Sequence, residues 1–266
     1  NSYARKFFHQ LVSSQLDMDR LDYLRRDSFF TGVMEGTIGV DRIISMLHVH
    51  RDQLVVEEKG IYSIENFLSS RRLMYWQVYL HKTTVSAERM MVNLIRRAQA
   101  LVRAGEFVPA SDALHLFLKH PHTIETFGKS KEALQAFGQL DDNDIWGAIK
   151  FWKDNPDRIL SLLSQMLLER QLFQILLSND PIRKSSIENI RNILSRHYQT
   201  LRAETAYLFS YGTVSNEAYT EGQTINILTR TGELLDIAQA SDLPNIKAIS
   251  KIVKKNYLCW PKNVSL

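Results

Sequence analysis

Cysteine is nearly absent from this chain of 266 residues, with Cys259 as its single example. One thiol excludes an intramolecular disulfide and is typical of a reducing compartment. We expect Cys259 to be packed rather than reactive. The sequence also lacks a secretory signal peptide and any uninterrupted apolar run long enough to span a bilayer. We therefore predict a cytoplasmic protein that is not embedded in a membrane.

An excess of one charge is also missing. Lysine and arginine number 33 against 29 acidic residues, which leaves a net charge of +4. No long basic run occurs, so a nucleic-acid partner is not expected. Neither G-x-x-x-x-G-K-[ST] nor G-x-G-x-x-G is present, so side chains rather than a glycine loop would have to bind any phosphate. Apolar residues make up 44% of the chain, enough for a sizeable globular core.

Helical periodicity dominates the first part of the chain. The pattern predicts helices across most of residues 3–198, interrupted by a small hairpin that turns at Arg51–Asp52. Ser13 or Ser14 would cap the helix that follows them. One long helix is expected over 59–82, and Thr83 or Thr84 would cap the next, which runs to about Arg103.

The last part of the chain has a different character. Residues 206–211, 225–237 and 255–260 are rich in strand-forming side chains, and the second of these would turn at Thr231–Gly232. The predicted fold is therefore mainly α, with a small α+β C-terminal region. We place the boundaries between three regions at 1–104, 105–200 and 201–266.

The segment Gln15 to Asp27, Q-L-D-M-D-R-L-D-Y-L-R-R-D, carries four aspartates and three arginines. On a helical wheel, one sector of roughly 100° holds four polar side chains: Asp19, Arg20, Tyr23 and Asp27. Asp22 and Arg26 form an i,i+4 pair on another side. A solvent-exposed charged helix would show the same pattern, so both a binding face and a plain surface stay open.

A second helical segment, R-R-L-M-Y-W-Q-V-Y-L-H-K, gives a similar stripe. A sector of about 80° holds two cations and two phenols: Arg71, Tyr75, Tyr79 and Lys82. Arginine and lysine suit phosphate oxygens, and tyrosine offers a flat apolar wall with one hydroxyl for a sugar. A packed aromatic stripe whose cations reach solvent is the alternative explanation.

Other candidate residues are less specific. His48 and His50 would share one face of a strand, but no third metal ligand lies at an obvious spacing. Asp141, Asp142 and Asp144 are not followed by an EF-hand pattern. We expect these aspartates to cap the next helix instead.

The two stripes lie in segments that resemble a known family. S-Q-L-D-M-D-R-L-D-Y-L-R-R-D-S-F-F-T-G-V is similar to the last metal-site segment of HD-domain phosphohydrolases. The similarity is greatest to the dNTP triphosphohydrolase branch, which includes the sterile-alpha-motif/HD-domain enzyme and bacterial relatives. V-V-E-E-K-G-I-Y-S-I-E-N-F-L and the second stripe extend it. The resemblance implies that residues 1–104 are the C-terminal part of an HD domain.

The resemblance implies roles for the first stripe and for one arginine of the second. Asp19 matches the aspartate that supplies the last metal ligand. Arg20, a catalytic-site residue by this similarity, and Arg71 match basic residues that contact the triphosphate. Tyr23 and Asp27 match residues that hold the deoxyribose, with Asp27 at its 3′-hydroxyl.

Further residues of the second helical segment have matches too. Tyr79 matches the tyrosine beneath the sugar, where a 2′-hydroxyl would clash. Tyr75 stands where the animal enzyme has a histidine, and we group it with the substrate-binding residues. His81 and Lys82 match positions that touch an activating nucleotide in some members. The wheel instead places Lys82 with the substrate stripe, so its role stays open.

The chain departs from the family at the metal site. That site needs a histidine and a later His-Asp pair, both N-terminal to Asp19. No His-Asp pair occurs here, and His9 is the one histidine before Asp19. One carboxylate cannot hold a catalytic ion alone. Because the chain begins at Asn1 in mid-domain, we expect the other ligands upstream in the full protein, around a divalent ion (Mn, Fe, Mg, Ni or Zn).

Three functions remain from these observations. The first is metal-dependent hydrolysis of deoxynucleoside triphosphates to deoxynucleoside and triphosphate. The second is an HD phosphohydrolase that acts on another nucleotide or phosphoester. The third is a non-catalytic nucleotide-binding or regulatory protein. The resemblance also implies assembly as a homo-oligomer, a dimer or a tetramer.

Overall fold

The computed structural model describes residues 4–216, 224–242 and 253–265. The chain divides into two compact units. The first contains residues 1–81 and 214–254, and the second contains residues 82–213 and 255–266. The chain therefore enters the second unit at residue 82, returns to the first at residue 214 and enters the second again at residue 255.

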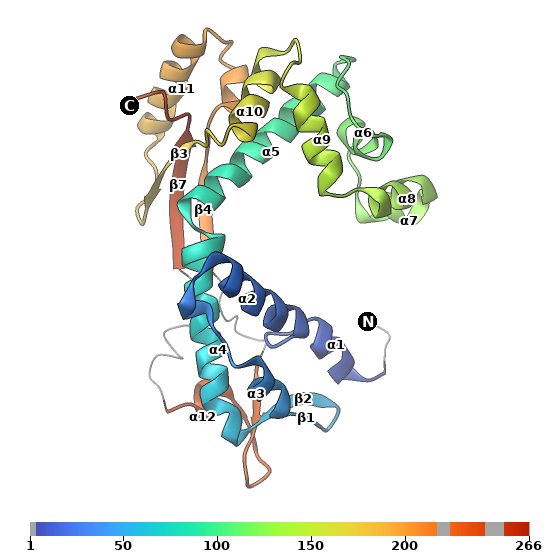
Figure 1. Cartoon of the computed structure of the whole chain (residues 1–266), viewed down its shortest axis with the longest axis vertical. Helices are drawn as coiled ribbons and strands as arrows, with labels where there is room; N and C mark the ends of the chain where they lie inside the picture. Colours follow the sequence, from blue (N-terminus) through green and yellow to red (C-terminus); the bar gives the residue numbers. More distant parts are fainter. Residues whose placement is uncertain (1–3, 217–223, 243–252, 266) are drawn as a thin grey trace. The chain divides into compact units, whose positions relative to one another are not determined.

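Helices and a small sheet make up the first unit (Figure 1). Its α-helices are α1 (Lys6–Val12), α2 (Met18–Thr31), α3 (Val40–Ser45), α4 (Ile61–Met74) and the short α12 (Ile237–Ala240). Short 3-10 turns are η1 (Met34–Gly36) and η2 (Glu58–Gly60), and α4 continues into a π-helical turn, η3 (Tyr75–Tyr79). The strands are β1 (Leu47–His50), β2 (Gln53–Glu57), β5 (Asn226–Leu228) and β6 (Leu234–Asp236).

The sheet of the first unit has the strand order β1-β2-β5-β6. β1 and β2 form the predicted hairpin, in which Arg51 and Asp52 adopt positive φ angles of 47° and 62°. β5 and β6 form the second predicted hairpin, with Gly232 at φ 84°. β2 pairs in parallel with β5, so a segment from the end of the chain completes this sheet.

The core of the first unit joins these elements. Leu24 of α2, Phe67 of α4 and Ile227 of β5 all belong to one buried cluster, and each is 0% exposed. Leu21 of α2 and Ile237 of α12 lie in the same cluster. Burial of this apolar surface fixes α2 against α4 and orients the polar faces of both helices.

The second unit is built on the long helix α5 (Lys82–Arg103). Its other helices are α6 (Asp112–Lys119), α7 (Ile124–Lys129), α8 (Lys131–Gln139), α9 (Asp142–Trp152), α10 (Arg158–Leu168), α11 (Lys184–Tyr198) and the 3-10 turn η4 (Glu204–Tyr207). A three-stranded sheet has the order β3-β7-β4, with β3 (Gln174–Ser178), β7 (Val253–Trp260) and β4 (Ser210–Asn216). Cys259 of β7 is 0% exposed, as predicted.

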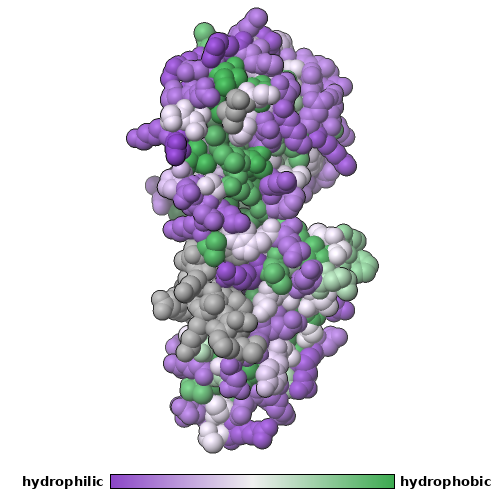
Figure 2. Space-filling model, turned by 90° about the vertical axis from the view of Figure 1, so that its left-hand side faces the viewer, coloured by the Kyte–Doolittle hydropathy of each residue, from purple (hydrophilic) through white to green (hydrophobic). Residues whose placement is uncertain are grey.

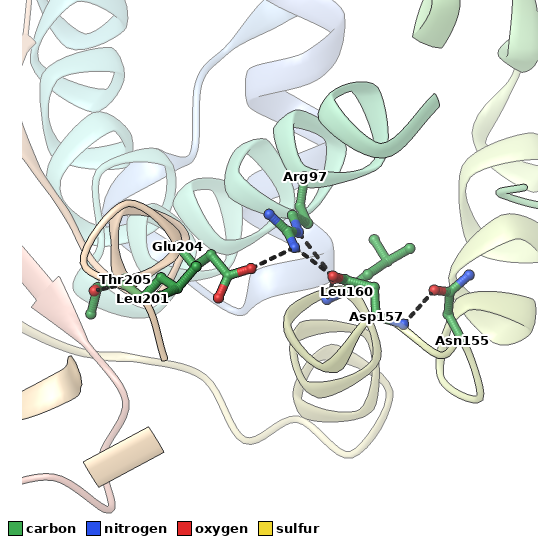
Figure 3. Close-up of polar contacts among 7 residues, drawn as sticks. All are labelled: Arg97, Asn155, Asp157, Leu160, Leu201, Glu204 and Thr205. Carbon is green, nitrogen blue, oxygen red and sulfur yellow. Dashed lines mark hydrogen bonds and ion pairs between the residues drawn. The ribbon is translucent and has the colours of Figure 1, made fainter. Parts of the chain in front are cut away.

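An ion network ties three elements of the second unit together (Figure 3). Arg97 of α5 donates from Nε to Asp157 over 3.0 Å and from Nη2 to Glu204 over 3.0 Å. Asp157 also accepts the backbone N–H of Leu160 and so caps α10. Burial alone would raise the pKa of Asp157, but the hydrogen bonds from Arg97 and from the helix N-terminus outweigh it and lower the pKa.

The start of α2 differs from the prediction. Its N-cap is Asp17, not Ser13 or Ser14, because the Asp17 carboxylate accepts the Arg20 N–H. The helix ends at Gly32, which closes it with φ 71° in the left-handed region.

Three further boundaries are corrected. The helix expected over 59–82 ends at Met74, because the π turn follows. Helix α5 begins at Lys82, so Thr83 and Thr84 lie inside its first turn and do not cap it. The strand expected over 206–211 begins only at Ser210, since Glu204–Tyr207 is a 3-10 turn. Helix α7 and strand β3 were not predicted.

The fold is mainly α with a small α+β part, as predicted. The compact units do not follow the predicted boundaries after residues 104 and 200, because α5 starts the second unit at Lys82 and residues 214–254 pack with the first. Figure 2 shows a surface that is largely hydrophilic, with apolar residues gathered in a few areas. In the described residues, no helix combines the length and the apolar character needed to cross a membrane.

Candidate substrate site

The first turn of α2 is held by a buried carboxylate. Asp17 is 2% exposed and accepts the backbone N–H groups of Arg20, over 2.8 Å, and of Ser14, over 3.2 Å. The Arg20 guanidinium also donates to Asp17 and to the carbonyl oxygen of Ser14. Arg20 is therefore held at the helix start by the residue that caps the helix, while Asp19 is exposed.

The π-helical turn positions the two tyrosines that follow α4. The N–H of Leu80 donates to the carbonyl oxygen of Tyr75 over 2.6 Å, five residues back. This wider turn departs from the α-helical phase, and such turns occur frequently at functional sites. The rings of Tyr75 and Tyr79 meet edge to face, with centroids 5.3 Å apart.

A hydrogen bond joins the π turn to α2. The Tyr79 hydroxyl donates to the Asp27 carboxylate over 2.6 Å. The Tyr23 ring meets the Tyr79 ring edge to face at 5.8 Å. Three phenols and one carboxylate from two distant segments thus form one group.

Arg71 of α4 lies beside this group and is buried, with 3% exposure. Its Nη1 donates to Gln15 Oε1 over 2.6 Å, and its Cζ is 5.8 Å from the centre of the Tyr75 ring. Its Nε is buried and has no hydrogen-bond partner among the residues that the structure describes. A buried donor without an acceptor is costly, which is consistent with a site that binds an oxygen-rich ligand.

The environment raises the pKa of two of the phenols, those of Tyr23 and Tyr79. Burial, reinforced by Tyr75, raises the pKa of Tyr23 to about 12, although Arg71 and Arg20 act in the opposite direction. Burial and the neighbouring Asp27 carboxylate raise the pKa of Tyr79. Both hydroxyls therefore remain hydrogen-bond donors near neutral pH.

The structure brings most of the predicted site residues together. Tyr23 and Asp27 of α2 lie in one group with Arg71 of α4 and with Tyr75 and Tyr79 of the π turn. Arg20 is close enough for its charge to act on Tyr23. The roles of all these residues stay predictions.

The other three predicted residues are described by their places in the chain. Asp19 is exposed on the first turn of α2. His81 follows the π turn, and Lys82 begins the second unit. The helical wheel that grouped Lys82 with the second stripe assumed an uninterrupted α-helix. The π turn at Tyr75–Tyr79 breaks the spacing of about 100° per residue before Lys82, so the wheel no longer applies to that residue.

Sequence reasoning missed two supporting residues, Gln15 and Asp17. Both are buried polar side chains, at 3% and 2% exposure, and they hold Arg71 and Arg20 respectively. Gln15 precedes the helix, so no helical spacing rule points to it. Asp17 could have been predicted as the N-cap of α2, because aspartate is a typical N-cap whose side chain accepts the N–H of a residue two or three positions later.

No complete metal site lies among the described residues, where no group of three or more histidine, cysteine, aspartate or glutamate side chains could hold an ion. The ring Nε2 of His48 instead donates to the Glu57 carboxylate over 2.6 Å. The acidic residues near 141 form a helix cap, in which Asp141 accepts the N–H groups of Asn143 and Asp144. Asp19 alone does not fit a divalent ion.

A cavity of about 800 Å³ flanks another side of α2. Its lining includes Asp22, Arg25 and Phe29, which lie away from the wheel sector of Tyr23 and Asp27. The Asp22–Arg26 ion pair forms on this side, as predicted. The cavity is therefore separate from the phenol and carboxylate group.

Comparison with known proteins adds a family match. Residues 38–115 match the family described as the HD associated region. This range contains β1, β2, α4 and the π turn, and so it holds Arg71, Tyr75 and Tyr79.

Three relatives extend the comparison. A phosphohydrolase of known structure from Bacteroides thetaiotaomicron is 48% identical with a TM-score of 0.91, covering 98% of this chain and 65% of its own. The uncharacterized protein YwfO of Bacillus subtilis is 28% identical over 99% of this chain and 59% of its own length. A deoxynucleoside triphosphate triphosphohydrolase SAMHD1 homolog of Dictyostelium discoideum is 30% identical over 41% of this chain and 21% of its own length.

These comparisons support an HD-type phosphohydrolase as the class of protein. Two relatives match this chain along nearly all of its length, and the chain covers 65% and 59% of their own lengths. The substrate, the metal and the assembly of the whole protein follow only as proposals.

Proposed function

We propose that this chain is part of an HD-type phosphohydrolase that converts deoxynucleoside triphosphates to deoxynucleoside and triphosphate. The observation that carries the proposal is the hydrogen bond of 2.6 Å from Tyr79 to Asp27, which brings a carboxylate and aromatic rings together beside Arg71. The similarity to a triphosphohydrolase homolog over part of the chain supports the substrate class.

Asp27 and the tyrosines would bind the deoxyribose. An ionised carboxylate has about four acceptor positions, and Tyr79 uses one of them, so Asp27 can accept a further hydrogen bond from a 3′-hydroxyl. The flat faces of Tyr23 and Tyr79 would pack against the ring of the sugar. A 2′-hydroxyl would compete for the space that Tyr79 occupies.

Arg71 and Arg20 would bind the triphosphate. Guanidinium groups match phosphate oxygens in geometry and charge. The buried Nε of Arg71, which has no acceptor among the described residues, would gain one from a phosphate oxygen. His81 and Lys82 would contact an activating nucleotide, and the protein would assemble as a dimer or a tetramer.

Asp19 would contribute one ligand to a divalent ion. The described residues do not complete such a site, so hydrolysis needs ligands from outside them. A nucleotide-binding protein without hydrolytic activity is the second candidate, and the incomplete ligand set is the observation that favours it. Binding of dNTP without turnover by the metal-loaded full-length protein would establish this second function.

The test is product analysis with the full-length protein. We expect intact triphosphate and deoxynucleoside from dNTP, with NTP hydrolysed at least tenfold more slowly. Tyr79→Ala should reduce the preference for dNTP over NTP and raise KM for dNTP. The substitution removes both the aromatic ring against the sugar and the hydroxyl that donates to Asp27. Tyr62→Ala is the matched control, since Tyr62 lies on α4 and is 72% exposed.

Two results would contradict the proposal. Release of inorganic phosphate or diphosphate would show a different cleavage position. Equal discrimination between dNTP and NTP in Tyr79→Ala and the unchanged protein would remove the sugar role from Tyr79.

A further inference from the structure

The second unit contains a cavity of about 610 Å³ that plays no part in the site described above. It is lined by the loop at residues 107–111 and by helices α6 and α9, which Figure 1 shows beside each other. Its size lies in the range of roughly 300–1,000 Å³ typical of small-molecule sites. The residues that define its chemistry are Phe107, Asp112, His115, Asp144, Gly147 and Phe151.

Gly147 stands within α9, where glycine lowers helix stability relative to alanine. Close packing would explain a glycine there, but a Cβ atom built on Gly147 meets no atom within 4 Å. The residue lines the cavity, so its missing side chain leaves the helix backbone open to the hollow. Packing within the fold therefore does not explain glycine at this position, and the open backbone leaves room for a flat molecule to lie on it.

Two phenylalanine side chains of the cavity are largely hydrated. Phe107 is 85% exposed and Phe151 is 70% exposed. Exposed phenyl rings cost free energy in water, and that cost falls when a planar apolar surface covers them. Rings of this kind at a cavity are suited to stacking with a heteroaromatic ring.

Two polar side chains of the cavity, Asp112 and Asp144, are carboxylates that can accept hydrogen bonds, beside the neutral polar side chains of Ser111 and Asn143 and the imidazole of His115. Asp144 accepts the N–H of Asp141 over 2.8 Å, and a hydrogen bond from Ser111 helps to lower its pKa, so the carboxylate is ionised. Asp112 lies on the facing helix α6. Among the lining residues that the structure describes, there is no lysine or arginine. Such a lining accepts N–H groups and repels phosphate.

The walls of the cavity are held in place before any ligand arrives. The indole N–H of Trp152, at the end of α9, donates to the carbonyl oxygen of Pro109 over 2.7 Å. Trp152 and Ala148 are buried, at 0% and 3% exposure. This hydrogen bond holds the loop at residues 107–111 against α9, so binding of a ligand in the cavity needs little rearrangement of the protein.

We propose that this cavity binds a phosphate-free heteroaromatic molecule with N–H donors, a nucleobase or a nucleoside. The ring lies over Gly147 against the phenyl rings, and its N–H groups donate to Asp144 and Asp112. This binding needs no hydrolysis and goes beyond the proposed function. One consequence does rest on the proposed function: the deoxynucleoside released by the reaction fits the cavity, whereas the triphosphate substrate does not.

The experiment is a titration of the whole protein with deoxyadenosine, deoxyguanosine, deoxycytidine and thymidine, and separately with the four dNTPs. Saturation-transfer NMR and isothermal calorimetry report binding. We expect at least one nucleoside to bind, with Gly147→Leu weakening its affinity tenfold or more because the side chain fills the hollow. Gly138→Leu is the matched control, since Gly138 lies in α8 and its Cβ would also meet no atom within 4 Å.

Several outcomes separate this site from the proposed substrate site. Nucleoside binding that survives Arg71→Ala and Tyr79→Ala but is lost in Gly147→Leu supports the inference, even if the protein hydrolyses nothing. Absence of binding by all four nucleosides at millimolar concentration overturns it, and so does equal affinity of Gly147→Leu and Gly138→Leu. Hydrolysis of dNTP with unchanged rates in Gly147→Leu leaves the proposed function intact in either case.

Discussion

Individual residues of the candidate site are held by polar neighbours, of which Gln15 and Asp17 are buried. Arg71 is held by Gln15, Arg20 by Asp17, and Tyr79 by Asp27. Five members of the group follow from helical spacing in the sequence, because residues four apart lie on one helix face. Gln15 could not be predicted in this way, since its contact with Arg71 joins positions that only the folded chain brings together.

The phenol of Tyr23 should make stability depend on alkaline pH. Its pKa rises from 10.0 to about 12 on folding, mainly because of burial. A raised pKa means that the neutral form is favoured in the folded state. The stabilisation is fully present below pH 10 and is lost as pH rises towards 12. After a discount for solvent screening, the loss is on the order of 1 kcal/mol.

Denaturant titrations at several pH values between 9 and 12 measure this effect. Tyr23→Phe should lose less stability than the unchanged protein across that range, because phenylalanine has no proton to release. Tyr62→Phe, with an exposed ring, should follow the unchanged protein. Identical slopes for all three proteins would show that Tyr23 does not carry the dependence.

At the scale of elements, hydrophobic periodicity predicted most helices correctly but placed several of their ends wrongly. The cap at Gly32 and the two hairpin turns follow from residue type. The end of α4 does not, because nothing in R-R-L-M-Y-W-Q-V-Y-L-H-K distinguishes a π turn from continued α-helix. Strand β3 was missed because Gln174–Ser178 lies in an apolar run, where a buried strand and a helix look alike.

The N-cap of α2 should contribute strongly to the stability of that helix. Asp17→Ala removes the acceptor for two backbone N–H groups and the partner of Arg20, with an expected loss of about 1–2 kcal/mol in unfolding free energy. Asp17→Asn keeps an acceptor oxygen and should lose less. The control Asp22→Ala breaks an exposed ion pair and should cost under about 0.5 kcal/mol. Equal losses in Asp17→Ala and Asp22→Ala would rule out a special role for the cap.

In the second unit, the ion network of Figure 3 should stabilise the contacts of α5 with α10 and η4. The Arg97 side chain is 13% exposed and bridges Asp157 and Glu204. Arg97→Ala leaves two partly buried carboxylates without a counter-charge, so we expect a loss of about 2–3 kcal/mol. Arg202→Ala, which breaks an exposed pair with Glu188, should cost well under about 1 kcal/mol. Thermal unfolding of both variants measures the difference, and similar melting temperatures would contradict the assignment.

At the scale of the whole molecule, the C-terminal segment was assigned to the wrong neighbours. Its hairpin over 225–237 was predicted correctly, but as part of a separate region after residue 200. In the structure, β5 pairs in parallel with β2, and Ile225, Ile227 and Ile237 enter the core of the first unit. Sequence patterns show which side chains are apolar, yet not which distant strand they will join.

This arrangement makes the candidate site depend on residues far from it in sequence. Ile227 is 0% exposed and packs in the same cluster as Leu21 and Leu24 of α2. Ile227→Ala should lower the unfolding free energy by about 2–4 kcal/mol, from lost burial and the cavity left behind. Because that core fixes α2 against α4, amide exchange in both helices should accelerate although the mutation lies on β5. Ile44→Ala is the matched control, since Ile44 is 49% exposed on α3 and should change exchange little. If Ile227→Ala accelerated exchange only in β5 and β6, the C-terminal hairpin would be an attachment to the first unit and not a part of its core.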